Sequence, residues 1–407
     1  MELKIDVGKI KNAVVCTLLF FAAINFCSKY FYFAFASLLF MFLLQKKIII
    51  DLTSVIYILP CLLMAVYNRN EGVLSMLRCF TPVLLYWVGY NMTVVRSQED
   101  DAAADFDPAE AQKNSYLLLL VMSFGSFSHY ILNYVINFGK QIGRNTNDIW
   151  TGSALAATGQ TALACLMLGL AVAMIILPPR RGFRAIGAVC IIGVLAYNLI
   201  LACRTSIVIL LIVFAVGFLY AMRVLEDRGA KQRLRFCITG SFLLLAVIFA
   251  FDIGGIQKIV MNSSLFARFS ALSKITSSSF PRLHAKLAFL STAYKYPFGG
   301  LNMRAMYGYA HDLLLDGYDE YGAAGFIMLA GIIVSGVRRL WIFLRRTDHA
   351  VSLKLAFLCV YVAVLLEFCV EPILAGMAWL FPFYCLINGS LTGLNASYFK
   401  KQKNAEK

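Results

Sequence analysis

A histidine at the end of a polar stretch, with two aspartates after it, is the pattern in this chain best suited to proton transfer. His311 is one of four histidines in 407 residues, and Asp312 and Asp316 follow it directly. Histidine is the side chain whose ordinary pKa allows proton transfer near neutral pH. If 308–322 is helical, the two aspartates share one helix face, and a neighbouring carboxylate could orient the imidazole. His311 is therefore a candidate general base, although the same pattern is also typical of an interfacial histidine that caps a helix.

A second candidate is Arg204, which stands with Thr205 and Ser206 between two apolar runs. Ionisable groups at membrane depth are costly, so they suggest a function. The planar guanidinium group suits phosphate or pyrophosphate, and the two hydroxyls can cap the following helix, whose N-terminus favours an anion. Arg204 is therefore a candidate diphosphate ligand, unless it only extends to lipid headgroups.

Other cations lie in segments that we place on the same side of the membrane as Arg204. Arg282 follows Pro281, Arg144 lies in a polar stretch, and Arg304 precedes a tyrosine-rich stretch. A surface with several arginines and few acids attracts an anionic, lipid-linked substrate. It also attracts ordinary anionic headgroups, which is the simpler explanation for any one of these residues.

The composition places these residues in a membrane protein. Hydrophobic residues make up 60% of the chain and charged residues 14%, against about 45–50% and about 25% in soluble domains. A span needs about 20 mainly apolar residues. Twelve segments are candidates, so we predict an all-α, polytopic fold with a single transmembrane domain over 1–407. The predicted spans are 11–28, 30–46, 48–67, 74–95, 115–138, 152–177, 184–202, 205–222, 234–251, 320–337, 350–371 and 375–394.

The charge distribution orients this scheme. Most lysines and arginines fall on one set of alternating loops, which predicts that both termini are cytoplasmic. One inside loop, 96–113, is acidic and is predicted to be a flexible connector. One outside loop, 252–318, is long, and long loops are often functional. We expect it to be partly helical and to contribute to the active site.

The same data exclude several classes of protein. The net charge of +15 is spread over short loops between apolar runs, which argues against nucleic-acid binding. The 11 cysteines mostly lie inside apolar runs without metal-ligand spacing, so neither a disulfide framework nor a zinc site is expected. No cofactor is predicted.

The chain resembles the superfamily of O-antigen polymerases and O-antigen ligases. Four features carry the resemblance, and the motifs among them cover about 200–330. The first feature is the twelve-span plan with one long outer loop late in the chain, and the second is Arg204-Thr205-Ser206, which opens an apolar helix. The third is the segment around Arg282 together with Tyr296-Pro297-Phe298-Gly299-Gly300. The fourth is Ala310-His311-Asp312, followed by an apolar run and by Gly322 and Gly325. The family usually has asparagine where Asp312 stands, so the part that this residue plays in positioning an acceptor is open.

The resemblance implies a family C type glycosyltransferase architecture in a bacterial cytoplasmic (inner) membrane. It implies a glycan donor on undecaprenyl diphosphate, an acceptor repeat unit, membrane lipid and a chain-length regulator protein as partners. Arg204, Arg282 and Arg144 would bind the diphosphate, and His311 would take the proton from the acceptor hydroxyl. The residues assigned to orienting the acceptor are Asp312, Asp316 and Arg304.

The expected chemistry is the transfer of the glycan with inversion at the anomeric carbon. Guanidinium groups would stabilise the leaving diphosphate, and the outer loop lacks an Asp-x-Asp motif, so metal independence is predicted. Three other functions remain open from the sequence. A ligase would deliver the finished glycan to a terminal acceptor, a flippase would move lipid-linked oligosaccharide across the bilayer, and a scaffold would have no catalytic role.

Overall fold

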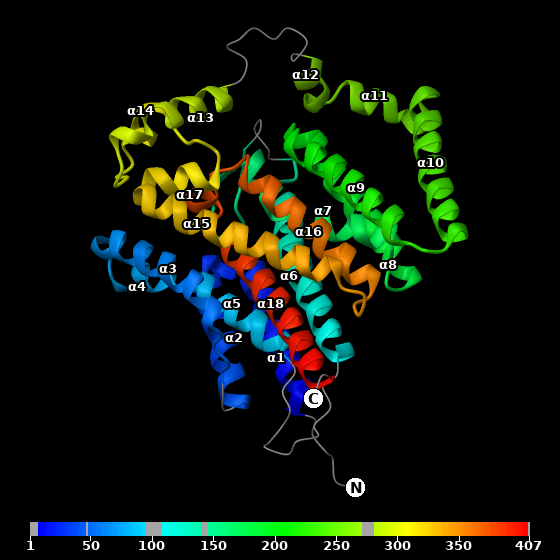
Figure 1. Cartoon of the computed structure of the whole chain (residues 1–407). Helices are drawn as coiled ribbons and strands as arrows, with labels where there is room; N and C mark the ends of the chain where they lie inside the picture. The colour runs from blue at the N-terminus through cyan, green and yellow to red at the C-terminus, as the bar shows by residue number, and fades with distance from the viewer. Residues whose placement is uncertain (1–6, 46–47, 95–107, 140–144, 271–280, 406–407) are drawn as a thin grey trace. The chain divides into compact units, whose positions relative to one another are not determined.

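The computed structural model describes residues 7–45, 48–94, 108–139, 145–270 and 281–405. These residues are helical except for loops and one small antiparallel hairpin, β1 (Asn145–Asn147) with β2 (Ala154–Ala156). The prediction of an almost entirely helical chain is thus confirmed (Figure 1). The chain divides into two compact units. The first unit comprises Met1–His129, Arg282–Ala350 and Phe368–Lys407, and the second comprises Tyr130–Pro281 and Val351–Glu367.

The helices of the first unit come from both ends of the chain and from the long loop. Helix α6 (Pro108–Asn137) starts in this unit and ends in the second, and α13 begins at the last residue of the second unit. The remaining helices are α1 (Val7–Ala23), η1 (Phe26–Ser28), α2 (Tyr30–Gln45), η2 (Leu52–Ser54), α3 (Val55–Tyr67), η3 (Arg69–Glu71), α4 (Val73–Arg78), α5 (Thr81–Thr93), α13 (Pro281–Thr292), η7 (Ala293–Lys295), α14 (Asn302–Tyr307), α15 (Leu313–Arg345), α17 (Ile373–Gly376) and α18 (Leu380–Ala405).

The second unit is built around α7, which is buried along almost its whole length. Its interior is formed of small and aliphatic side chains, so neighbouring backbones approach closely. Besides the hairpin and the end of α6, the unit contains α7 (Ala157–Ile176), α8 (Arg181–Leu201), α9 (Thr205–Val224), α10 (Arg228–Ala250), η4 (Ile253–Gly255), α11 (Ile256–Met261), α12 (Ser264–Ser270) and α16 (Val351–Phe368).

Each predicted span falls largely on a helix, but not all of these helices are long and apolar enough to cross a bilayer. Eight helices in the described part of the chain meet that condition. Helices α1, α2 and α3 have 17, 16 and 13 residues, short of the roughly 20 that a span needs. Helix α18 is long, but its C-terminal half is polar. The structure therefore supports several membrane-spanning helices, and the count of twelve stays a prediction.

The acidic connector 96–113 lies mostly outside the described residues, since the description resumes at residue 108 with α6. The long loop 252–318 is partly helical in its described portions, as predicted, with α11, α12, α13 and α14; its place on the outer side of the membrane stays a prediction. The boundary between the two units runs through this loop, between residues 281 and 282. The second half of the loop, which carries His311, therefore belongs to the first unit.

Helix α15 is broken near its start, and this break positions the loop before it. Gly322 has φ 71° and ψ −164°, a left-handed conformation that favours glycine. A side chain there would collide with the backbone of Pro297 and Phe298, and the amide of Ala323 donates to the Pro297 carbonyl at 2.9 Å. The break separates a short polar helix, 313–321, from the apolar helix that follows, and the predicted span 320–337 begins at this point.

Glycines set the closest helix contact of the first unit, between α5 and α18 (Figure 1). A Cβ atom on Gly89 would collide with the Leu386 carbonyl, and one on Gly389 would collide with the Tyr86 carbonyl. Small residues allow such close approach between helices in membranes.

We expect Gly89→Ala to lower the free energy of unfolding by about 1–3 kcal/mol, because the added methyl group forces the two backbones apart. Gly331→Ala on α15 is the matched control, since a Cβ there meets nothing within 4 Å. It should be neutral or slightly stabilising. Thermal unfolding of the purified protein in detergent measures both, and equal Tm values for the two variants would contradict the glycine contact.

Candidate active site

His311 lies in the loop between α14 and α15, directly before the residue that caps α15. Its φ of 55° places it in the left-handed region, which is uncommon for residues other than glycine, although asparagine, aspartate and histidine adopt it more often than the rest. The side chain is 28% exposed, and its Nδ1 atom has no hydrogen-bond partner among the described residues. Strained backbone of this kind is often found at functional sites. The expectation that 308–322 is helical is wrong at its start, because α15 begins only at Leu313.

Two aspartates hold the backbone on either side of His311. Asp316 is fully buried and accepts hydrogen bonds from the amides of Ala310, at 3.1 Å, and Asp312, at 3.3 Å. Asp312 is the N-cap of α15 and accepts from the amides of Leu314 and Leu315, at 3.1 and 3.4 Å. Both carboxylates therefore fix the loop rather than the imidazole ring. Asp316 has no exposed surface, so it cannot contact a substrate. It acts by holding the backbone on either side of His311.

Two cations on successive turns of α13 reach the same region. Arg282 Nη1 donates to the Val370 carbonyl at 2.8 Å and contacts Glu371 Oε1 at 3.1 Å. Lys286, four residues further on, donates to Asp312 Oδ2 at 2.9 Å and to the Cys369 carbonyl at 2.5 Å. Residues at this spacing share a helix face. The arginine side chain is 38% exposed and the lysine side chain 23% exposed, so both keep a surface that a ligand can reach.

Glu371 joins the arginine to the histidine. Its side chain is only 2% exposed, and its second oxygen, Oε2, lies 3.9 Å from His311 Nδ1. The site thus consists of an imidazole, two cations and two carboxylates from three segments of the first unit: α13, the turn before α15, and the turn after α16.

The charges around His311 keep it neutral. Burial, together with Arg282 and Lys286, lowers the pKa of His311 to about 4. Glu371 is nearby, but its charge is shared with Arg282, so the two cations outweigh it. At neutral pH the imidazole therefore has a free lone pair, which is the state that a general base requires.

Arg304 has a different environment from Arg282. Its guanidinium group lies 3.6 Å from both Asp319 and Glu320, and it stacks 4.6 Å from the centre of the Tyr309 ring. Asp319 also accepts from the amide of Met303 at 2.9 Å. Arg304 thus fastens α14 to the start of α15, so its effect on an acceptor would be exerted through this loop.

Arg204 belongs to the second unit, whereas Arg282 and His311 belong to the first. Its Nη1 donates to the Arg268 carbonyl at 3.4 Å, and Arg268 in turn donates to the Ala202 carbonyl at 2.6 Å. These bonds hold the turn that opens α9. Arg144 lies outside the described residues. The joint action of Arg204 or Arg144 with Arg282 therefore stays a prediction.

Sequence reasoning missed Lys286 and Glu371 as site residues. Lys286 could have been found by its spacing of four from Arg282 on a predicted helix. Glu371 is an acid between two apolar runs and is followed by proline, which is an unusual place for a charge. The contact with Arg282, 89 positions away, could not have been read from one sequence.

Substitutions at Asp312 separate its capping role from its charge. We expect Asp312→Asn to retain nearly full stability, because asparagine caps helices as well as aspartate does. Asp312→Ala should lower the free energy of unfolding by about 1 kcal/mol. Chemical unfolding of the two variants checks this, and a loss in Asp312→Asn as large as that in Asp312→Ala would mean that the ion pair with Lys286 matters more than the cap.

No protein-family model matches the chain, and no curated protein matches it significantly. The fold is that of a mainly helical membrane protein. Eight helices in its described part are apolar and long enough to span a membrane.

Proposed function

We propose that this protein is a polysaccharide polymerase of the O-antigen or capsule type in a bacterial cytoplasmic membrane. It transfers a glycan from undecaprenyl diphosphate to a hydroxyl of an acceptor repeat unit. The observation that supports this best is a partly exposed histidine, whose pKa is lowered, beside two partly exposed cations. A base for a hydroxyl and a cationic site for a diphosphate are the two groups that this reaction needs.

The diphosphate would bind to Arg282 and Lys286. Arginine presents a planar fork that pairs with two phosphate oxygens, and lysine adds a compact charge. In the free protein these cations are held by Glu371, Asp312 and backbone carbonyls, so they are ordered before the substrate arrives. Such preorganised charges are effective where negative charge develops during the reaction. Arg204 and Arg144 are proposed as further diphosphate ligands.

In the proposed step, a ring nitrogen of His311 accepts the proton of the acceptor hydroxyl. The hydroxyl oxygen then attacks the anomeric carbon, and the bond from that carbon to the phosphate oxygen breaks. The electron pair leaves with the lipid diphosphate, whose charge is stabilised by Arg282 and Lys286. A single displacement of this kind inverts the anomeric configuration, and we propose that no divalent metal is needed.

Substrate binding would strengthen the base. Burial is the largest cause of the lowered pKa of His311 in the free protein, and the two cations lower it further. A bound diphosphate offsets their positive charge, so the pKa of His311 should rise toward its ordinary value when the donor is present. The histidine would thus be neutral before binding and more basic afterwards.

A pH profile tests this coupling. Activity requires the unprotonated histidine, so it falls as the pH drops through the pKa of His311. The acidic side of the kcat/KM profile reports the pKa of the free enzyme, so its midpoint should lie near pH 4. The acidic side of the kcat profile reports the pKa in the enzyme–substrate complex, so its midpoint should lie at higher pH. Coinciding midpoints would contradict the charge coupling between donor and histidine.

The proposal itself is tested by the product. The purified protein in nanodiscs is supplied with repeat units linked to undecaprenyl diphosphate, and the new linkage is examined by NMR. An inverted anomeric configuration supports a single displacement, whereas retention would contradict it. Delivery of the glycan only to a different terminal acceptor would identify a ligase instead.

A further inference from the structure

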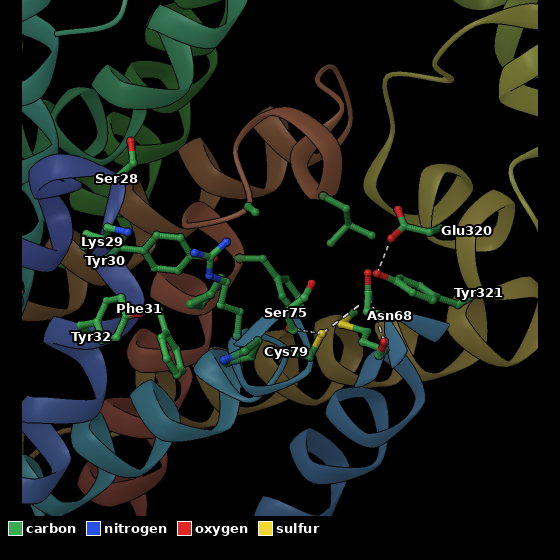
Figure 2. Close-up of a pocket in the computed structure, with 17 residues that line it drawn as sticks. Ser28, Lys29, Tyr30, Phe31, Tyr32, Asn68, Ser75, Cys79, Glu320 and Tyr321 are labelled. Atoms are coloured by element: carbon green, nitrogen blue, oxygen red, sulfur yellow. Dashed lines mark hydrogen bonds between the residues drawn. The ribbon is translucent and has the colours of Figure 1, made fainter. Parts of the chain in front are cut away.

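A second polar site lies in the first unit, next to the candidate active site. It is a pocket of about 330 Å³, at the small end of the range of about 300–1,000 Å³ in which proteins bind small molecules. Its walls come from the turn between α1 and α2, from the start of α2, from α3, α4 and α5, from α15, and from α17 and the start of α18. Figure 2 shows Lys29 and Tyr30 on one side of it and Glu320 and Tyr321 on the other.

The pocket carries an excess of positive charge. Lys29 and Arg78 both line it, and neither has a carboxylate within ion-pair distance in the part of the chain that the structure describes. The acid in the lining is Glu320, which is already engaged by Arg304 at 3.6 Å and by the Tyr321 hydroxyl at 2.5 Å. The two cations of the pocket could therefore pair with one negative charge of a ligand.

The rest of the lining suits a sugar ring. Tyr30, Tyr32 and Tyr321 supply aromatic surface, and Asn68 and Ser75 supply polar groups in the lining (Figure 2). Aromatic rings present flat apolar faces with polar edges, which match the apolar face and the hydroxyl groups of a pyranose. The small volume leaves little room for an acyl chain.

Two residues of the pocket lining lie close along the chain to residues of the candidate active site. Glu320 lies on α15, eight residues beyond Asp312, a rise of about 12 Å along a helix. Leu374, also in the lining, lies three residues beyond Glu371. A molecule that reaches the active site is thus within a short distance of the pocket.

We propose that this pocket binds one acidic sugar, a pyranose that carries a carboxylate. Arg78 and Lys29 pair with the carboxylate, and the tyrosines contact the ring. This inference rests on the proposed function, since the sugar would belong to the glycan that the protein transfers. The pocket would then select repeat units that contain a uronic acid.

Saturation-transfer NMR on the purified protein tests binding without requiring transfer. The probes are glucuronate, glucose and inorganic phosphate, each added to protein in nanodiscs of neutral lipid, and glucuronate is also added to protein in nanodiscs that contain phosphatidylglycerol. We expect saturation of glucuronate only, in both kinds of nanodisc. Arg78→Gln should weaken its binding at least about tenfold, because a charged hydrogen bond is lost. Arg69→Gln is the matched control, an exposed arginine on the adjacent η3 that does not line the pocket, and it should leave binding unchanged.

Four other outcomes overturn the inference. Equal binding of glucose would remove the role of the charge, and binding of phosphate alone would make the pocket a simple anion site. Loss of the glucuronate signal in nanodiscs with phosphatidylglycerol would assign the pocket to a lipid headgroup. Glucuronate binding that Arg78→Gln and Arg69→Gln leave equally intact would place the sugar elsewhere. A protein that binds glucuronate here but never transfers glycan would contradict the proposed function and leave the sugar site standing.

Discussion

His311→Asn is expected to reduce glycan transfer by about 10²–10⁴-fold, which is the range that general base catalysis supplies. The native φ of 55° at this position is one that asparagine adopts more readily than most residues. The variant should therefore fold normally and keep its Tm within a few degrees. Asparagine cannot accept a proton at neutral pH, so the loss would be confined to the catalytic step.

The matched control is His284→Ala. His284 is an exposed histidine on α13, within the same long loop. The His284→Ala variant should transfer glycan at close to the native rate. Initial rates with saturating donor measure both variants, and native-like activity in His311→Asn would remove His311 from the mechanism. Equal losses in the two variants would point to a general disturbance of the loop.

Arg282→Met is expected to lower both stability and activity, for two different reasons. Glu371 is 2% exposed, and removing its arginine leaves a buried carboxylate without its cation, which costs about 3 kcal/mol. The figure is at the low end of the usual range because Arg282 is itself 38% exposed. Transfer should also fall, because the diphosphate loses its forked ligand.

The double variant Arg282→Met/Glu371→Leu separates these effects. Replacing both members of a buried ion pair with apolar residues is often neutral for stability. We therefore expect the free energy of unfolding to recover while transfer stays low. Urea unfolding and initial rates are measured on the single and double variants. Recovery of activity together with stability would mean that Arg282 only neutralises Glu371 and does not bind the donor.

Hydropathy predicted where the helices lie, but less well where they end. The span predicted at 320–337 begins near the break at Gly322, but the helical residues before the break start at Leu313. The first two turns look polar in sequence because Asp316 and Asp319 are there, yet both are buried and bind backbone amides of the preceding loop. A hydropathy average counts such residues as solvent-exposed. The opposite difference occurs for α1 and α3, which end or begin inside the predicted spans 11–28 and 48–67.

For the site, the sequence identified the residue types but not their partners. His311 and Arg282 were named from their chemistry, and the structure brings both within reach of Glu371. The prediction that a neighbouring aspartate orients the imidazole differs from the contacts that Asp312 and Asp316 make, which are with backbone amides. An aspartate just before or inside the first turn of a helix binds the free backbone amides there in preference to a side chain. Glu371 was missed because its contacts join segments that are far apart in sequence.

The central claim is most directly tested by polymer formation with the purified protein in EDTA. Repeat units linked to undecaprenyl diphosphate are supplied as donor and acceptor, and the products are separated by size. We expect a ladder of glycans that EDTA does not diminish. Absence of any ladder, with lipid-linked units crossing the bilayer of proteoliposomes instead, would contradict a transferase and assign the protein to transport.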